Sequence, residues 1–424
     1  MSRIGFPLGV AVVLTGYAAL LGWDVFHYDW LRGYDAYANS LYADVIRDHH
    51  RLPTETESGV WHTPPLFFFV AALIDSHRGM QVLDGIAALV VVIFAGLIAR
   101  ELFPRSRALQ LGALAFAGLA PVLTRTAVMY HPEPLATALA VAGLYVVVRA
   151  LARGRPGPWT GGLAGLLFGL GTLTRTWTLS FAAASCLALL VRARLNRERE
   201  PVWGAALLVG VLLVLSLPWF IHQAREHGSP FAFNRPAPNE SFFGRRPASF
   251  YTSLDVEAVF SHPYAPNYLN HLWPVTYTDW WGDYWRYFEL PYENISSPPA
   301  LPPKYENPRV RQSYLGIAPS ILAVAGLLGA LVVGVRRRQV GLVLLPVAII
   351  ALGLEFLVFQ IAYPHPDGDT IKAAYLLDAV APLGVCAALA LVSLSRAGRY
   401  VMIAVLLFLA YIAALDIAFL VLPA

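Results

Sequence analysis

Residues 400–422 read YVMIAVLLFLAYIAALDIAFLVL, and residues 6–26 read FPLGVAVVLTGYAALLGWDVF. Each run holds about twenty residues with a single acid, which is enough α-helix to cross the apolar core of a bilayer. Over all 424 residues, 57% are hydrophobic, 14% are charged and the mean hydropathy is +0.56. Soluble domains are about one quarter charged. The composition therefore excludes an ordinary globular enzyme and indicates a polytopic membrane protein.

The remaining bulk properties exclude other classes. The net charge of +4 does not indicate a nucleic-acid partner, because the basic residues gather at the ends of apolar runs. Cys186 and Cys386 lie in separate apolar runs, which favours neither a disulfide framework nor a cysteine metal site. Residues 1–26 lack a small-residue cleavage signature, so we expect the first run to remain as a helix.

The apolar runs define the expected topology. Pro64–Ile74 is too short to cross a membrane alone, so we expect a short helix in the outer interface. About eleven runs are long enough to cross, and they are 6–26, 85–103, 107–124, 132–152, 160–175, 177–192, 202–222, 313–335, 341–362, 373–394 and 400–422.

Arginine placement supports this topology. With a cytoplasmic N-terminus, every cytoplasmic helix end carries arginine, as the positive-inside rule requires. A full crossing at Pro64–Ile74 would move the later arginine-rich ends to the other side. The cytoplasmic arginines are then Arg3, Arg100, Arg105, Arg107, Arg149, Arg153, Arg155, Arg192, Arg194, Arg197, Arg199, Arg336, Arg337, Arg338, Arg396 and Arg399.

The same topology places two long segments outside, a first outer loop over 27–84 with juxtamembrane helices and a large outer loop over 223–312. Apart from Glu101, Glu198 and Glu200, the 27 acidic residues lie in outer loops or within the membrane. Any chemistry is therefore expected on the extracytoplasmic face, where neither ATP nor nucleotide sugars are available. We predict one all-α transmembrane domain over 1–424, without a separate soluble domain, in the cell inner membrane.

The first outer loop contains an acid whose position leaves two interpretations open. Residues 36–49 place Leu41, Val45 and Ile46 on one helical face, which is typical of a helix on the membrane surface. Asp35 comes directly before this helix. Its carboxylate either caps the helix N-terminus or points into a site.

Short motifs follow in a fixed order along the chain. After Asp35 and the surface helix come Arg51-Leu52-Pro53 and His62-Thr63-Pro64-Pro65-Leu66, and later motifs stand at 127–135, 169–175, 217–231 and 371–375. Together they resemble the GT-C glycosyltransferases that use lipid-phosphate sugars, in the branch of the protein O-mannosyltransferases and the lipid A aminoarabinose transferase. Family members often have Asp-Glu where this chain has Asp35-Ala36, and some carry an additional soluble domain.

The resemblance implies a function and a catalytic residue. It implies transfer of a sugar from a polyprenyl-phosphate carrier to an acceptor hydroxyl of a lipid, glycan or protein, with inversion. It assigns the base to Asp35, with Asp29 as the competing acid. Phosphate is already a good leaving group, so a cationic clamp and a base would suffice.

The clamp has two leading candidates, Arg175 and Lys372, with Tyr375 beside Lys372 in a Lys-x-x-Tyr element. Both cations are predicted at outer helix ends, where the positive-inside rule does not explain them. The alternative is that they snorkel to lipid headgroups. Arg125 and Arg246 are weaker candidates.

A metal site is a further hypothesis. His131 and Glu133 stand two residues apart at an outer helix end, where they would help to hold Mg²⁺ or Mn²⁺. The alternative is that Glu133 stabilises the N-terminus of its own helix.

Further candidates would bind the sugar or the acceptor. The large outer loop is dense in aromatic residues, which either stack on substrate or form an interfacial belt. Glu355, Asp378 and Asp416 lie within apolar runs and either act in a site or bond neighbouring helices. The candidates for acceptor or sugar binding are His62, Trp280, Trp281, Asp283, His365 and Asp367.

Two other classes remain open from the sequence. A transporter or flippase would favour polar sites near the bilayer midplane and duplicated halves, whereas this chain concentrates unusual polar residues outside. A glycan polymerase or ligase would share the outer site and a lipid-linked substrate.

Overall fold

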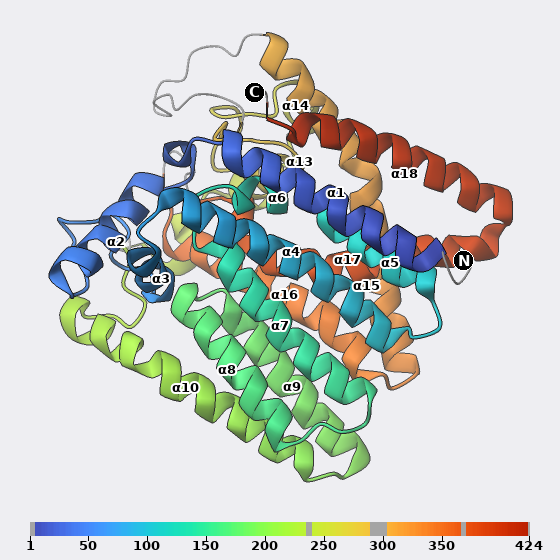
Figure 1. The fold of residues 1–424 in the computed structure, drawn as a ribbon, viewed down its shortest axis with the longest axis horizontal. Helices are drawn as coiled ribbons and strands as arrows, with labels where there is room; N and C mark the ends of the chain where they lie inside the picture. The colour runs from blue at the N-terminus through green and yellow to red at the C-terminus, as the bar shows by residue number, and fades with distance from the viewer. Residues whose placement is uncertain (1–4, 235–239, 289–302, 366–369, 423–424) are drawn as a thin grey trace.

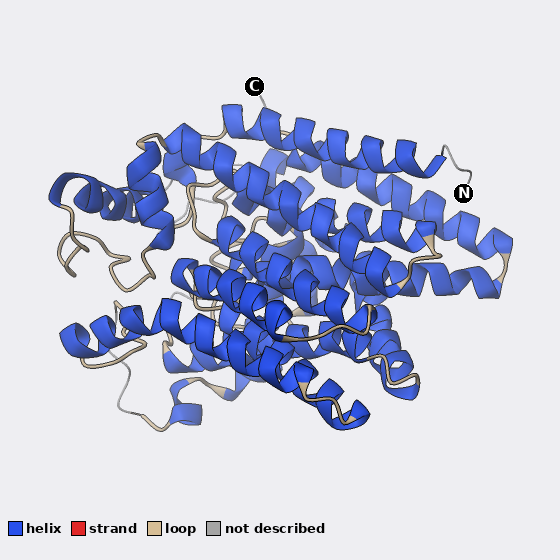
Figure 2. Ribbon diagram, turned by 60° about the horizontal axis from the view of Figure 1, so that its bottom comes forward, coloured by secondary structure: helices blue, strands red, loops and turns tan. Residues whose placement is uncertain are grey.

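The computed structural model describes residues 5–234, 240–288, 303–365 and 370–422. Within these ranges every regular element is a helix and none is a strand (Figure 2). The long helices run roughly parallel as a single bundle (Figure 1). The all-α, polytopic fold expected from the sequence is confirmed.

The α-helices up to the large outer loop are α1 (Gly5–His27), α2 (Ala36–His49), α3 (Leu66–Ile74), α4 (His77–Leu102), α5 (Arg107–Gly118), α6 (Pro121–Ala127), α7 (Glu133–Ala152), α8 (Pro158–Thr174), α9 (Thr178–Asn196) and α10 (Glu200–His227). Those that follow are α11 (Ala248–Thr252), α12 (Val256–Ser261), α13 (Leu272–Trp281), α14 (Pro303–Leu315), α15 (Ile317–Arg336), α16 (Val340–Ala362), α17 (Val380–Ser393) and α18 (Arg399–Leu420). Short 3₁₀ turns are η1 (Trp30–Arg32), η2 (Phe242–Arg245), η3 (Ala373–Ala379) and η4 (Leu394–Ala397).

The number of spans differs slightly from the prediction. Among the described residues, nine helical segments are long and apolar enough to cross a membrane, or ten if α5 and α6, bent by 53°, form one span. The sequence predicted about eleven. The remaining predicted run, 160–175, is α8, which has only 17 residues. The short apolar segment 64–74 forms α3, a helix of nine residues, which is too short to cross alone.

Helix α8 is short because its ends are fixed by local sequence. Pro158 occupies the first turn, and Arg175 adopts an extended conformation that ends the helix. Glycines let it pack tightly: a Cβ on Gly161 would lie 1.8 Å from the carbonyl oxygen of Gly204 in α10. This close contact fixes the start of α8 against α10. Near the other end of α8, a Cβ on Gly169 would lie 2.7 Å from the side chain of Leu215, also in α10. The helix that ends at Arg175 is therefore held against α10 at both ends.

The first outer loop gathers at one end of the bundle. Helices α2 and α3 lie at the end opposite the start of α1, near the last turns of α10 (Figure 1). The predicted surface helix over 36–49 is α2, and Tyr42 stacks on Phe68 of α3 with ring centroids 3.8 Å apart. This contact anchors the segment that carries Asp35.

Candidate active site

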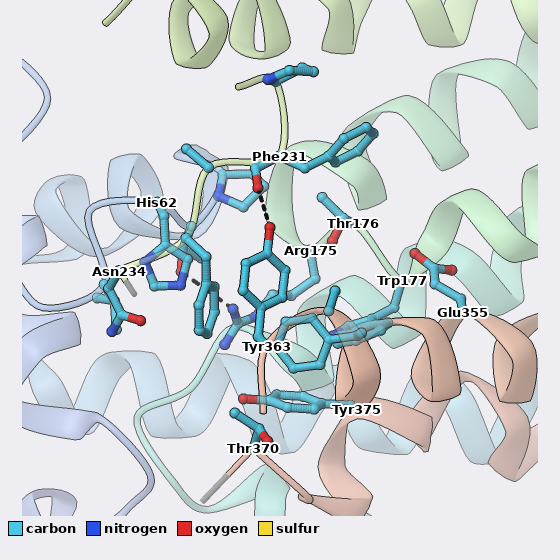
Figure 3. Close-up of a pocket in the computed structure, with 18 of the residues that line it drawn as sticks. His62, Arg175, Thr176, Trp177, Phe231, Asn234, Glu355, Tyr363, Thr370 and Tyr375 are labelled. Atoms are coloured by element: carbon cyan, nitrogen blue, oxygen red, sulfur yellow. Dashed lines mark hydrogen bonds between the residues drawn. The ribbon is translucent and has the colours of Figure 1, made fainter. Parts of the chain in front are cut away.

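A cavity of about 400 Å³ lies where the first outer loop meets the ends of α8, α10 and α16. We call it the outer cavity. Figure 3 shows His62, Arg175, Tyr363 and Tyr375 converging on it from different parts of the chain. Asp35 and Lys372 also line it. Five of the residues proposed from the sequence therefore share one cavity, namely Asp35, His62, Arg175, Lys372 and Tyr375.

Asp35 faces this cavity instead of capping α2. Its backbone is left-handed, with φ 51°, and its side chain makes no capping hydrogen bond. A non-glycine residue in this conformation is strained, and such strain is concentrated at functional sites. The carboxylate instead pairs with the Lys372 ammonium, with Oδ2 and Nζ 3.3 Å apart. The Asp35 side chain is 37% exposed and that of Lys372 only 4%, so the acid is the accessible partner.

The electrostatics around Asp35 favour its ionised form. Burial raises the pKa of its carboxyl, but the nearby Lys372, His131 and Arg175 lower it by more. The net result is a pKa of about 2, below the ordinary value of 3.8. Asp35 is thus a carboxylate at neutral pH, although a weakly basic one while Lys372 remains its partner.

Arg175 belongs to a second charged group next to the first. Its Nε lies 2.7 Å from Oε1 of Glu133, which is the first residue of α7 and only 2% exposed. The other carboxylate oxygen of Glu133 pairs with His131. Arg175 also donates a hydrogen bond to Thr63 Oγ1, at 3.3 Å. Glu133 therefore orients Arg175 at the cavity and also lies at the N-terminus of α7, as one sequence alternative proposed.

These residues do not fit a divalent cation. Both oxygens of Glu133 already contact Arg175 and His131, and the guanidinium would compete with a metal. Among the described residues, no group of three or more His, Cys, Asp or Glu is arranged to hold a metal ion. We therefore assign no chemical step to Mg²⁺ or Mn²⁺ at His131 and Glu133.

Aromatic rings line the rest of the cavity. Tyr375 stacks on Trp177 with centroids 5.0 Å apart, and the Arg175 guanidinium lies 5.9 Å from the centre of the Tyr375 ring. His62 packs its imidazole edge against Phe233. Burial and the charge of Arg175 lower the pKa of His62 to about 3, so its ring is neutral and suited to hydrogen bonding with a hydroxyl.

Other candidates lie outside the cavity. Trp280 packs against the hydrophobic core, while Trp281 donates to Ser320 Oγ and lines a separate apolar groove beside α18. Asp283 accepts hydrogen bonds from the backbone N–H groups of residues 287 and 288. These positions do not support the expected contacts of Trp280, Trp281 and Asp283 with a sugar in the outer cavity. His365 is not among the lining residues, and Asp367 lies outside the described residues.

The competing charged residues also have structural contacts. Asp29 caps η1 by accepting from Leu31 N, at 3.0 Å. Arg125 donates to the carbonyl oxygen of Asp279 and Arg246 to that of Gln360. Asp378 accepts from Thr137 across a helix interface, at 2.7 Å.

The sequence missed several lining residues. Trp177 stands two residues after Arg175, so its proximity to that cation was a usable signal. Phe233 and Tyr363 come from segments without a motif and reach the cavity only through the tertiary fold. Glu355, for which the sequence left both a site role and a helix contact open, lines the cavity and also accepts a hydrogen bond from Ser180 in the first turn of α9.

One protein-family model matches part of this chain. Residues 62–222, less than half of the chain, match the family model described as dolichyl-phosphate-mannose-protein mannosyltransferase. The resemblance to GT-C glycosyltransferases is thereby confirmed. A search of curated protein sequences finds no match.

Solved structures support the same fold. An Archaeoglobus fulgidus oligosaccharyltransferase, in complex with zinc and sulfate, matches 97% of this chain and 53% of its own length, at 15% identity and a TM-score of 0.54. The same organism's AglB, in complex with an inhibitory peptide and a dolichol-phosphate, matches 100% of this chain and 57% of its own, at 14% identity and a TM-score of 0.55. This chain thus spans about half the length of these relatives.

A weaker match is ArnT from Cupriavidus metallidurans, in a structure bound to undecaprenyl phosphate. It covers 93% of this chain and 80% of its own, at 18% identity and a TM-score of 0.38, a score that does not establish a common fold.

Proposed function

We propose that this protein is an integral-membrane glycosyltransferase that moves a sugar from a polyprenyl-phosphate carrier to an acceptor hydroxyl on the extracytoplasmic face. The observation that carries the proposal is the outer cavity, in which a carboxylate and two cations line one space beside aromatic rings. The family match over 62–222 and the dolichol-phosphate bound to the related AglB support a lipid-linked donor.

The donor phosphate is assigned to Lys372 and Arg175. Both are anchored by carboxylates, and both present charged nitrogens at a cavity lined largely by apolar groups. Charge-assisted hydrogen bonds to phosphate are strong in such surroundings. The stacked rings of Trp177 and Tyr375 offer flat apolar faces against which a sugar ring can pack.

The reaction is a single displacement at the anomeric carbon. The acceptor oxygen bonds to that carbon from the face opposite the phosphate, and the carbon–oxygen bond to phosphate breaks with inversion. The electron pair leaves on the phosphate, which Lys372 and Arg175 stabilise, while the acceptor proton passes to Asp35. No acid is needed, because the phosphate leaves as an anion.

Donor binding also strengthens the base. In the free protein Lys372 pairs with Asp35 and lowers its pKa. A phosphate that engages Lys372 partly neutralises this cation and so raises the basicity of Asp35. The base thus becomes competent when the donor is in place.

The inner membrane is the proposed location, with the N-terminus in the cytoplasm. Arginine placement supports this orientation, and it puts the outer cavity on the extracytoplasmic side.

One assay tests the proposal. Purified protein is incubated with a labelled polyprenyl-phosphate sugar and candidate lipid, glycan and protein acceptors. Release of polyprenyl phosphate by the wild type, but not by Asp35→Asn, is the expected result. A protein that moves the intact lipid-linked sugar between vesicle leaflets, and leaves the phosphate–sugar bond unbroken, would instead be a transporter or flippase.

A further inference from the structure

We propose that Asp279, in the large outer loop, is a positioning residue that fixes the base Asp35 and the donor-binding cation Lys372 relative to each other. This inference rests on the proposed function. The Asp279 carboxylate is buried between two parts of the chain that are far apart in the sequence. Asp279 lies near the end of α13 and is 3% exposed.

The two oxygens of Asp279 bind the neighbours of the two key residues. Oδ1 accepts a hydrogen bond from the hydroxyl of Tyr34, at 3.1 Å, and Oδ2 accepts one from the backbone N–H of Ala373, at 2.6 Å. Tyr34 immediately precedes Asp35, and Ala373 immediately follows Lys372. The Asp279 side chain thus bonds both to the segment that carries Asp35 and to the segment that carries Lys372. These two residues are 337 positions apart in the sequence.

Both segments need such a restraint. Asp35 is held in a strained left-handed conformation, which persists only when its surroundings enforce it. Lys372 is extended and directly precedes η3, so its direction depends on how Ala373 is held. Asp279 supplies a fixed acceptor to each segment.

The ring of Tyr34, whose hydroxyl Asp279 holds, contacts two residues of the site. The Lys372 ammonium lies 5.1 Å from the centre of this ring, and His131 packs against it edge-on at 5.8 Å. Asp279 holds the Tyr34 hydroxyl and therefore the ring. Asp279 is itself anchored, because Arg125 donates to its carbonyl oxygen, at 2.8 Å.

A cross-linking experiment tests this role without requiring activity. A carbodiimide joins a carboxylate and an amine in contact, so it is expected to form an amide between Asp35 and Lys372, detected by peptide mass spectrometry. In Asp279→Ala we expect the yield of this link to fall about tenfold, as for loss of a buried charged hydrogen-bond acceptor. Asp279→Asn should retain most of the yield, because its amide can accept from Ala373 and donate to Tyr34.

Two further variants complete the test. Tyr34→Phe removes only the hydrogen bond between the Tyr34 hydroxyl and Asp279, so it should lower the yield less than Asp279→Ala does. It tests the proposal if Asp279→Ala does not fold. Asp283→Asn is the matched control, since the Asp283 carboxylate contacts the backbone of residues 287 and 288 and the Arg309 guanidinium, and not residues 34 or 373. It should leave the yield unchanged. Wild-type yields in folded Asp279→Ala, or in Tyr34→Phe where Asp279→Ala is unfolded, would overturn the proposal.

Kinetics supply the second readout. Turnover by Asp279→Ala should fall about tenfold with an unchanged KM for the acceptor, and Asp279→Asn should recover most of it. Unchanged turnover in Asp279→Ala would overturn the proposal. If the wild type gives the cross-link but transfers no sugar, the proposed function fails while the positioning geometry stands.

Discussion

The outer cavity and the α13 region, which is α13 with the residues up to Asp283, both contain acids and aromatic rings. The acids and rings of the two regions differ in what they contact. At the cavity, Asp35 is 37% exposed and the two cations line an open space. In the α13 region, Asp279 and Asp283 both accept backbone hydrogen bonds, and Trp281 donates to Ser320. A high density of acids and aromatic rings therefore does not by itself locate a site. Charged groups that line a cavity next to helix ends, as Asp35, Arg175 and Lys372 do, locate it more reliably.

The largest effect is expected from Asp35→Asn. The amide keeps the size of the side chain but removes the proton acceptor, so the transfer rate should fall about 10²–10⁴-fold. Initial rates with a labelled donor measure this loss. Asp29→Asn is the control, because Asp29 only caps η1, and its rate should stay near that of the wild type. An Asp35→Asn rate within a few-fold of the wild type would assign the base elsewhere.

The next largest effect is expected from removing the cations. Lys372→Ala and Arg175→Ala should each weaken donor binding by about 10–100-fold, the value of a hydrogen bond to a charged group. Donor affinity and KM are the measurements, and Arg47→Ala, on the exposed face of α2, is the control. Wild-type donor kinetics in both cavity variants would remove the clamp from the mechanism.

Stability should separate these two cation variants. Arg175→Ala removes the guanidinium partner of Glu133, which is only 2% exposed and then keeps only its contact with His131. Removing one member of a buried ion pair typically costs about 3–5 kcal/mol. Lys372→Ala leaves the more accessible Asp35 and should cost less. Thermal unfolding in detergent measures both. A larger loss in Lys372→Ala would contradict the assigned pairing.

From the sequence, the residues that line the outer cavity were predicted better than the contacts of the large outer loop, and the reason is physical. Apolar runs and arginine placement fix where each helix ends, so acids and cations next to those ends, such as Asp35 and Arg175, can be assigned to a common side. Hydrophobic periodicity also predicted α2 with its observed bounds. The number of spans was predicted less accurately, because α8 has only 17 residues and is not among the helices long enough to cross a membrane.

Residues of the large outer loop depend on contacts that no local pattern encodes. Whether Trp281 meets a substrate or Ser320 is decided by how α13 packs against α15. The same holds for Asp279, whose partners Tyr34 and Ala373 are remote in sequence. A lining residue such as Phe233 has no motif at all, and only the fold brings it to His62.

A smaller effect is expected on stability in acid. The folded pKa of Asp35, about 2, lies below its ordinary value of 3.8, so its ionised form stabilises the fold above about pH 4. This contribution should be lost as the pH falls from about 4 to about 2. Because the side chain is 37% exposed, solvent screening limits it to about 1 kcal/mol. Unfolding of the wild type and Asp35→Asn across this range measures it, and parallel pH curves would contradict the assignment.

The smallest effect on catalysis is expected from substitutions of Asp283 and Trp281. Asp283→Asn and Trp281→Ala should change turnover by less than about threefold while lowering thermal stability, because each loses only structural contacts. A Cβ on Gly316 would lie 2.3 Å from the Trp281 ring, so this ring is tightly packed. A hundredfold loss of turnover with normal stability in either variant would restore the outer-loop residues as substrate contacts.

The most direct test is a cryo-EM structure of the wild-type protein with a polyprenyl phosphate bound. We expect phosphate oxygens within about 4 Å of both Lys372 Nζ and the Arg175 guanidinium, the range of an ion pair, with the Asp35 carboxylate facing the same space. A phosphate that contacts neither cation, for example one bound in the apolar groove beside α18 and Asp416, would contradict a single outer site that unites base and clamp.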